Sequence, residues 1–90
     1  MVCHAIARLN NRLGLHMRAS ANLVKTASKF QSRIFICYGP QIANAKSLLA
    51  ILTLAVTYGM DVRIFAEGED ASQALRAIKD LIENEIGRFT

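Results

Sequence analysis

The sequence lacks several features that would assign it to a particular class of protein. It has no run of 18 or more apolar residues, as a membrane-spanning helix would need, because its richest run, Leu48 to Val56, is short and contains Thr53. No basic segment followed by an apolar one opens the chain, so neither a secretory signal nor membrane insertion is expected. No linker, repeat or low-complexity segment interrupts the 90 residues, and we expect one domain over 1–90.

Cysteine is also scarce. Cys3 and Cys37 are too few for a disulfide framework. Each lies in a strand-like segment, where cysteine usually packs as a small buried hydrophobe, and a metal or disulfide role is the less favoured alternative. This usage fits a reducing compartment, so a cytoplasmic location is expected, with no metal and no cofactor.

Acidic residues are fewer than basic ones. The chain has 7 Asp and Glu against 11 Lys and Arg, for a net charge of +4, and the acids are denser near the C-terminus. A mildly basic surface suits an acidic protein partner or a phosphate. A small RNA-binding α/β domain would rest on this charge and on Phe35 and Tyr38. It is disfavoured, because the chain has no dense basic patch and no aromatic pattern of the RNP type, so no nucleic acid is expected as a partner.

Apolar periodicity predicts alternating strands and helices. The strands are predicted over residues 2–10, 33–38, 41–45 and 61–66. The helices are predicted over 17–29, over a short apolar run after Ser47 that ends before Gly59, and over 71–82 with Gly87 as a stop. Ser47 and Asp70 are predicted N-caps. The order β-α-β-β-α-β-α predicts an α+β fold, with helices on one face of a mainly antiparallel sheet.

The alternation of the strands also predicts which side chains face the helices. The core face is expected to hold Cys3, Ala5, Ala7, Leu9, Ile34, Ile36, Val62 and Ile64. The opposite face, expected to be open to solvent, then carries Ile6, Phe35, Cys37 and Phe65. Contiguous exposed apolar side chains are typical of an association surface, so we hypothesise a weak homodimer, or another partner, through this face.

The stretch from Gly14 to Ser20 carries the chemistry. It places His16 at a strand-to-helix turn, where the first helical amides have no partner within the helix and the helix dipole favours an anion. A histidine able to carry a phosphoryl group, Arg18 two residues later and free amides together predict a phosphate site. His4, on an alternating strand without a basic neighbour, is predicted to be structural.

These residues resemble the histidine-containing phosphocarrier proteins (HPr and NPr) of bacterial phosphotransferase systems. The family's phosphorylation motif, Gly-(Leu/Ile)-His-Ala-Arg-Pro-Ala, stands here as Gly14-Leu15-His16-Met17-Arg18-Ala19-Ser20. A second landmark, Lys-Ser before apolar residues, stands as Lys46-Ser47-Leu48-Leu49. The resemblance covers nearly the whole chain. It implies an open-faced, two-layer β-sandwich, in which three helices cover a four-stranded antiparallel sheet.

The resemblance also implies a function and its residues. His16 would accept a phosphoryl group on Nδ1 from enzyme I and pass it to an enzyme IIA, so the protein would be a carrier and not itself an enzyme. Transfer through a loose, metaphosphate-like state needs positioning and charge neutralisation. Arg18 and the backbone amides of Met17 and Arg18 would supply both.

Partner docking and regulation are implied at the second helix. Leu48 and Leu49 would dock enzyme I and enzyme IIA, whereas Ile51 and Leu54 are expected in the core. The predicted docking surface also includes Leu52, Lys25 and Lys46. Ser47 is the family's regulatory position, phosphorylated in some bacteria by an HPr kinase, although a plain N-cap serine is the favoured reading. The alternative function is a regulatory binding module that acts through docking and Ser47 phosphorylation, with little phosphotransfer.

The motif departs from the family pattern at three positions. Ala19 replaces the proline, which loosens the turn because proline would fix φ. Met17 replaces a small residue beside His16, and Ser20 stands where the family motif has alanine. The loop over 11–14 looks closer to the nitrogen branch of these systems, whereas Lys46-Ser47 is like the carbohydrate branch, which serves sugar transport. Both branches stay open.

Overall fold

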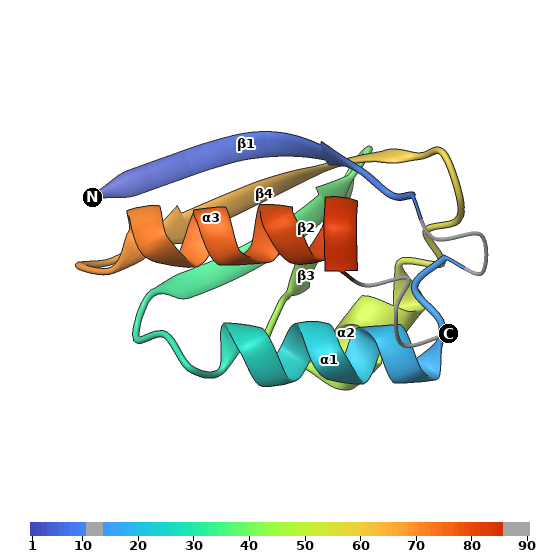
Figure 1. Ribbon diagram of the computed structural model, residues 1–90, viewed down its shortest axis with the longest axis horizontal. Coiled ribbons are helices and arrows are strands. Elements are labelled where there is room, and N and C mark those ends of the chain that lie inside the picture. Colours follow the sequence, from blue (N-terminus) through green and yellow to red (C-terminus); the bar gives the residue numbers. More distant parts are fainter. Residues whose placement is uncertain (11–13, 86–90) are drawn as a thin grey trace.

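The computed structural model describes residues 1–10 and 14–85. Over these residues the chain follows the predicted order β-α-β-β-α-β-α (Figure 1). The strands are β1 (Val2–Arg8), β2 (Arg33–Tyr38), β3 (Gln41–Asn44) and β4 (Asp61–Glu67). The helices are α1 (Met17–Ala27), α2 (Leu48–Thr53) and α3 (Ala71–Asp80), which continues as a π-helical turn, η1 (Leu81–Glu85). Most of the predicted loop over 10–14, and the stop at Gly87, lie outside the described residues.

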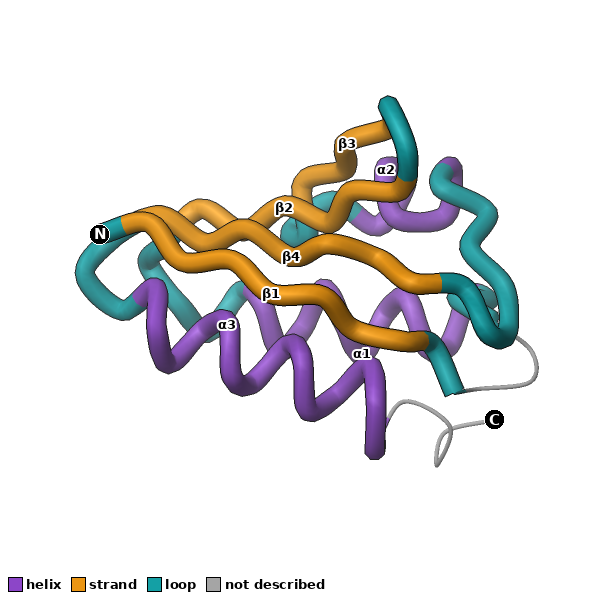
Figure 2. The backbone as a smooth tube through the Cα atoms, turned by 90° about the horizontal axis from the view of Figure 1, so that it is seen from above, coloured by secondary structure: helices purple, strands orange, loops and turns teal. Residues whose placement is uncertain are grey.

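The four strands form one sheet in the order β1-β4-β2-β3, with every neighbouring pair antiparallel. β2 and β3 form the predicted hairpin around Gly39-Pro40. The helices lie on one side of the sheet, where α3 packs against β1 and β4 and α1 packs against α2 and α3 (Figure 2). The other face has no helix over it in the described chain, so the predicted open-faced β-sandwich is confirmed.

The core lies between the sheet and the helices. Alternate strand residues fill it from one side, with Ile34, Ile36, Val62 and Ile64 almost fully buried. Apolar stripes of the helices fill it from the other side, as the helical periodicity predicted: Ala19, Leu23 and Ala27 of α1, and Ala71, Ala74 and Ile78 of α3. In β1, Ala7 is buried, as is Leu9 just after the strand, whereas Cys3 and Ala5 are only half-buried.

Helix α1 ends earlier than predicted, at Ala27 and not at Lys29. The amides of Lys29 and Phe30 donate to carbonyls only three residues back, at Thr26 and Ala27. Such bonds tighten the last turn of a helix and turn the chain away from its axis.

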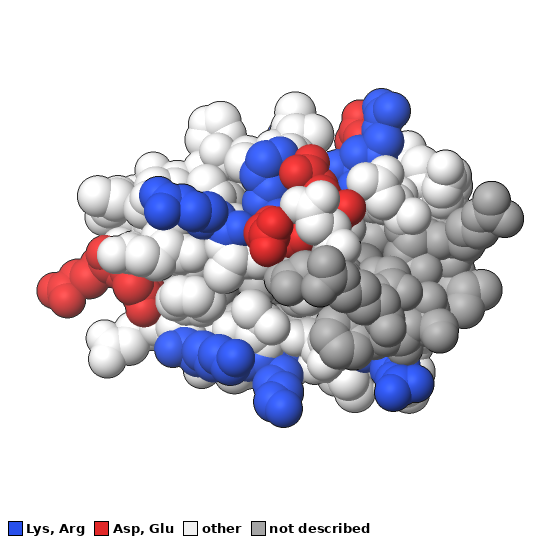
Figure 3. Space-filling view, in the orientation of Figure 1, with Lys and Arg blue, Asp and Glu red and all other residues white. Residues whose placement is uncertain are grey.

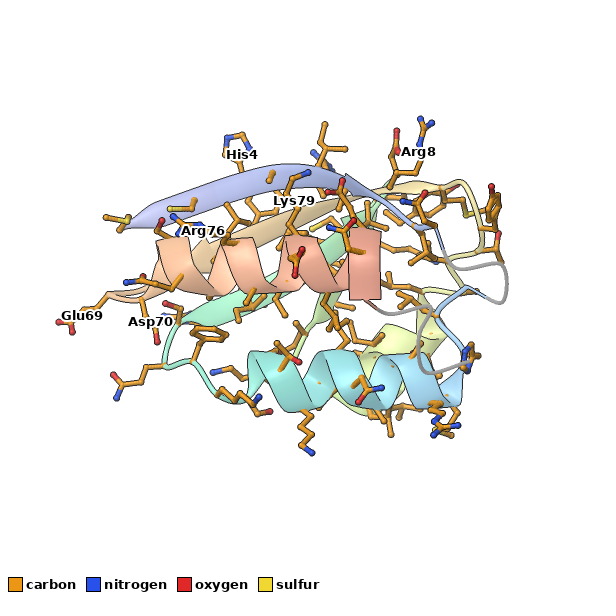
Figure 4. The ribbon with its side chains drawn as sticks, viewed as in Figure 1. His4, Arg8, Glu69, Asp70, Arg76 and Lys79 are labelled. Carbon is orange, nitrogen blue, oxygen red and sulfur yellow. The ribbon has the colours of Figure 1, made fainter. Side chains whose placement is uncertain are left out.

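Asp70 occupies the predicted N-cap position of α3, but the predicted cap hydrogen bond is absent. Its carboxylate instead accepts hydrogen bonds from the backbone N–H of Gln31 and of Ser32, each at 2.9 Å, and from the Ser32 hydroxyl. Asp70 lies at the start of α3 (Figure 4), so this contact ties that helix to the chain entering β2.

These hydrogen bonds make stability depend on pH at low pH. The Ser32 hydroxyl first, and the Gln31 amide next, hold the pKa of Asp70 below its usual value. A lowered folded-state pKa contributes stability that is present above the unfolded pKa, about 3.9, and is lost as pH falls through the folded pKa. Asp70→Asn should therefore flatten the fall in unfolding free energy between neutral pH and about pH 2 in urea titrations. Glu69→Gln, at the preceding residue, is the matched control. An unfolding free energy that falls as steeply with pH in Asp70→Asn as in the parent would contradict this account.

Candidate functional site

His16 is the N-cap residue of α1, as the sequence predicted. Its backbone is extended, with φ −76° and ψ 178°, and its carbonyl accepts the first helical hydrogen bond, from the N–H of Ser20 at 2.8 Å. The amides of Met17, Arg18 and Ala19 precede that bond and so have no partner within the helix. Three N–H groups that have no partner within the helix therefore follow His16 directly, at the positive end of the helix dipole.

The imidazole of His16 is half-buried and unevenly enclosed. Its Nε2 atom is buried and hydrogen-bonds to no residue in the described chain. The side chain also makes no cap hydrogen bond to the helix. The ring is therefore enclosed on its Nε2 side, while the residue as a whole keeps part of its surface open.

The turn before His16 is held by the segment that follows α2. The backbone N–H of Leu15 donates to the carbonyl of Val56 at 3.0 Å. Gly14 has φ +69°, and a Cβ there would lie 2.5 Å from the Val56 oxygen. Ala55, just before Val56, also has a left-handed backbone, with φ 54°. Glycine at residue 14 is therefore required both by its conformation and by this close approach.

Ser20 also holds this turn. It is fully buried, and its hydroxyl donates to the carbonyl of Leu15 at 3.0 Å. The sequence marked Ser20 only as a departure from a family motif, and a hydrogen bond spanning five residues has no simple periodic signature.

Arg18 and Met17 face outward beside His16. Arg18 is exposed and makes no hydrogen bond or ion pair with any described residue, and Met17 is 60% exposed. The guanidinium is therefore available to an anion brought to His16. The residues described include no group of three or more His, Cys, Asp or Glu side chains able to hold a metal ion.

Helix α2 begins as predicted, at an N-cap Ser47 whose hydroxyl accepts from the N–H of Ala50 at 3.3 Å. Leu49 is 76% exposed, and Leu48 and Leu52 are half-buried. Ile51 and Leu54 are buried, which confirms their predicted place in the core. Since α2 packs against α1 and leads to Val56, the exposed leucine and the His16 turn belong to neighbouring parts of the surface.

The two predicted docking lysines differ in their surroundings. Lys25 is exposed on α1. Lys46 is half-buried, and its ammonium donates to the carbonyl of Phe30 at 2.7 Å, so it links the chain just after α1 to the start of α2. Lys46 thus has a structural contact that the sequence did not reveal.

The charge of the helical layer is one-sided. The first 60 residues contain no Asp or Glu, and all seven acids lie between Asp61 and Glu85. In Figure 3 only basic side chains line the edge formed by α1, whereas acidic and basic side chains lie together over α3 and again at the upper right. The surface around α1 is therefore positive, and α1 contains no acidic side chain that could pair with its basic ones. The absence of Asp and Glu from the first 60 residues is visible in the sequence and is a stronger signal than the net charge of +4.

The open sheet face differs in one respect from its prediction. Ile6 is 59% exposed and Phe35 and Phe65 are half-buried, but Cys37 is buried. Arg63 lies opposite Cys37 in the sheet, and its guanidinium reaches the carbonyl of Gly39 at 3.5 Å and lies 5.9 Å from the centre of the Phe65 ring, so its side chain shares this face with the cysteine. The expectation that Cys37 is open to solvent is therefore wrong.

An apolar groove of about 470 Å³ runs across this face. Its lining includes Val2, Phe35, Cys37, Ile42 and Phe65. The predicted structural residue His4 projects from β1 on the side away from the helices (Figure 4), with its ring centroid 5.7 Å from that of Phe65.

Comparison with known proteins decides the family. The family model for the phosphorylation site of the HPr component of the phosphotransferase system (PTS) matches residues 5–84. The chain belongs to the HPr family of phosphocarriers. The phosphocarrier protein HPr of Xylella fastidiosa (strain Temecula1) is 40% identical over 82 residues, which cover 91% of this chain and 92% of that protein.

Solved HPr structures agree with this fold. HPr-C-His from Thermoanaerobacter tengcongensis superposes with a TM-score of 0.89 and 40% identity, over 94% of this chain and 96% of that one. An HPr dimer from the same organism gives a TM-score of 0.73 and 41% identity, over 89% and 92% of the two chains. The similarity covers both the His16 turn and α2. No helix among the described residues of this HPr-family chain has the length and apolar character to cross a membrane.

Proposed function

We propose that this protein accepts a phosphoryl group on Nδ1 of His16 from enzyme I and donates it to a histidine of an enzyme IIA. The observation that carries the proposal is the position of His16, a half-buried imidazole with Nε2 enclosed, beside three amides that have no partner within the helix and an exposed arginine. The protein is in this account a carrier, working with both partners in the cytoplasm.

The transfer follows from that geometry. With the proton on the enclosed Nε2, Nδ1 of the neutral ring holds a lone pair that attacks phosphorus. The bond from phosphorus to the donor breaks, and its electron pair stays with the donor. Nδ1 is next to the main chain, so a phosphoryl group there lies close to the amides of Met17 and Arg18. These amides and the Arg18 guanidinium offset the charge on its oxygens.

Docking is assigned to the surface formed by α1 and α2. Leu49 supplies exposed apolar area, flanked by Leu48 and Leu52, and α1 supplies positive charge through Lys25. Lys46 contributes by holding the start of α2 in place. An acidic partner with an apolar centre fits this surface, because opposite charges steer the encounter and the apolar contact stabilises the complex.

Labelling with radioactive phosphoenolpyruvate in the presence of enzyme I tests this function. We expect acid-labile, base-stable label on the parent protein, its loss in His16→Ala, and its discharge when an enzyme IIA is added. His4→Ala is the matched control and should label fully. Absence of label on the parent under conditions in which enzyme I itself is labelled would contradict the proposal.

A regulatory role at Ser47 is a second candidate. The Ser47 hydroxyl caps α2 and also lines a groove between β3 and that helix, with Ile42 and Leu49. A phosphate there would be favoured by the helix N-terminus and would place about −2 charge beside Leu48 and Leu49, repelling an acidic partner. Incubation with ATP and an HPr kinase, with Ser47→Ala as control, tests this, and an unlabelled parent would remove the candidate.

A weak homodimer through the open sheet face is a further proposal. Ile42 is 70% exposed and lines the apolar groove, and Ile6, on β1 and expected on the same face, is 59% exposed. The HPr dimer from T. tengcongensis supports association within the family without locating the interface. We expect the weight-average mass in sedimentation equilibrium to rise with concentration, and to rise less for Ile6→Asp. A constant monomer mass at millimolar concentration would contradict it.

A further inference from the structure

We propose that the Ser20 hydroxyl is a positioning group for His16 and takes over the stiffening role that proline at residue 19 has in the family motif. This inference rests on the proposed function of His16. Ser20 touches neither the phosphoryl group nor the partner in this account. It acts through the backbone that carries the imidazole.

Ser20 binds both peptide groups that flank His16. Its hydroxyl donates to the carbonyl of Leu15 at 3.0 Å, and its backbone N–H donates to the carbonyl of His16 at 2.8 Å. The orientations of these two peptide planes define φ and ψ of His16. One residue therefore fixes both backbone angles of the histidine, and only one of its two bonds depends on the side chain.

Among residues 1–10 and 14–85, no backbone N–H donates to the Leu15 carbonyl beside the hydroxyl. If α1 began one residue earlier, the N–H of Ala19 would donate to the carbonyl of Leu15. The first hydrogen bond of the helix instead runs from the N–H of Ser20 to the carbonyl of His16. Ser20 is fully buried and Leu15 nearly so, which keeps bulk water from this carbonyl. Loss of the hydroxyl therefore leaves the Leu15 carbonyl without a hydrogen bond from any described residue, and the nearest remaining restraint is on the preceding peptide, where the Leu15 N–H donates to Val56.

Residue 19 explains why the hydroxyl is needed. Ala19 is buried in the first turn of α1, and its N–H precedes the first helical bond, so a proline there would lose no helical hydrogen bond. A proline would also restrict φ at this point of the turn and lower the entropy of competing conformations. In this chain that restriction is absent, and the Ser20 hydroxyl supplies an enthalpic restraint one residue later.

The test is a double-mutant cycle in the full chain, made of the parent, Ser20→Ala, Ala19→Pro and the double variant. The measured quantities are kcat and KM for phosphoryl transfer from phosphorylated enzyme I, with the backbone order parameter of His16 from 15N relaxation. Ser20→Ala should lower kcat about tenfold, the effect expected from one buried hydrogen bond, with KM within about twofold because the docking surface is unchanged. The double variant should recover to within about threefold of the parent, since the two restraints replace each other.

The controls separate positioning from simple destabilisation. Ser28→Ala removes a hydroxyl from the exposed end of α1 and should change neither kcat nor the order parameter. Ser20→Cys, with a weaker donor of similar shape, should fall between serine and alanine. The His16 order parameter should drop in Ser20→Ala and return in the double variant.

An unchanged kcat and order parameter in Ser20→Ala, or a double variant no better than Ser20→Ala, would overturn the inference. If the parent accepts no phosphoryl group, the proposed function fails. In that case the His16 order parameters of the parent and of Ser20→Ala still test, independently of transfer, whether Ser20 positions His16.

Discussion

Replacing Gly14 with alanine should lower the unfolding free energy by about 3 kcal/mol and slow phosphoryl transfer about 100-fold. Two effects add. The residue has φ +69°, which costs an L-side chain energy, and the new Cβ would lie 2.5 Å from the Val56 oxygen and 2.9 Å from the Thr57 Cα. Backbone atoms on both sides must move, so the Leu15 N–H loses its bond to Val56 and the His16 turn shifts. Urea unfolding and initial-rate kinetics measure the two parts.

Gly39→Ala is the matched control for this prediction. Gly39 has a similar backbone, with φ +57°, but nothing lies within 4 Å of a Cβ built there. It should cost only the conformational energy, about 1 kcal/mol, and leave the transfer rate unchanged. Equal losses of stability in the two variants, or normal transfer by Gly14→Ala, would show that the contact with the Val56 segment does not hold His16 in place.

Leu49→Asp should lower kcat/KM for phosphoryl transfer from enzyme I about 10- to 100-fold, with the fold intact. The side chain is 76% exposed, so the core loses little when it is replaced. Burial of a leucine against a partner contributes about 1.5–3 kcal/mol, and each 1.4 kcal/mol is a factor of ten. An aspartate also repels the acidic partner that the positive surface of α1 favours. In the first turn of α2 it is itself tolerated, because the helix dipole favours a negative charge there.

Three comparisons make the Leu49 prediction specific. Leu49→Arg should be less damaging than Leu49→Asp, since it removes the same apolar area without repelling an acidic partner. Ile6→Asp, an exposed apolar residue on the opposite face of the sheet, should leave kcat/KM unchanged. Circular dichroism should show the same helix content throughout. A normal kcat/KM for Leu49→Asp, or a larger loss for Ile6→Asp, would move the docking surface away from α2.

The order of elements and the place of His16 could be predicted from the sequence because both follow local rules. Alternating apolar residues in β4 and the apolar stripe of α3 are visible over a few consecutive residues. The same holds for Ser47, whose cap bond to Ala50 spans three residues. The turn itself predicted a phosphate site at His16, and the resemblance to the HPr family added the expected partners and the acceptor nitrogen.

What could not be predicted depends on contacts between distant segments. The Asp70 carboxylate binds the chain 38 and 39 residues earlier in place of its own helix, and no local pattern distinguishes the two outcomes. Cys37 is buried although it lies on the open face of the sheet, opposite Arg63 of the neighbouring strand. Ser20 departs from the family motif, which the sequence shows, but its hydrogen bond to the Leu15 carbonyl depends on where α1 begins.

The phosphorylated nitrogen is the most direct test of the account. With 15N-labelled histidine, the protein phosphorylated by enzyme I and phosphoenolpyruvate should show one-bond coupling between phosphorus and a single ring nitrogen. The account predicts that this nitrogen is Nδ1 of His16, while Nε2 keeps its proton in the enclosed side of the site. Coupling at Nε2 of His16, or at His4, would contradict it, because the buried Nε2 and the helix amides would then have no part in choosing the acceptor.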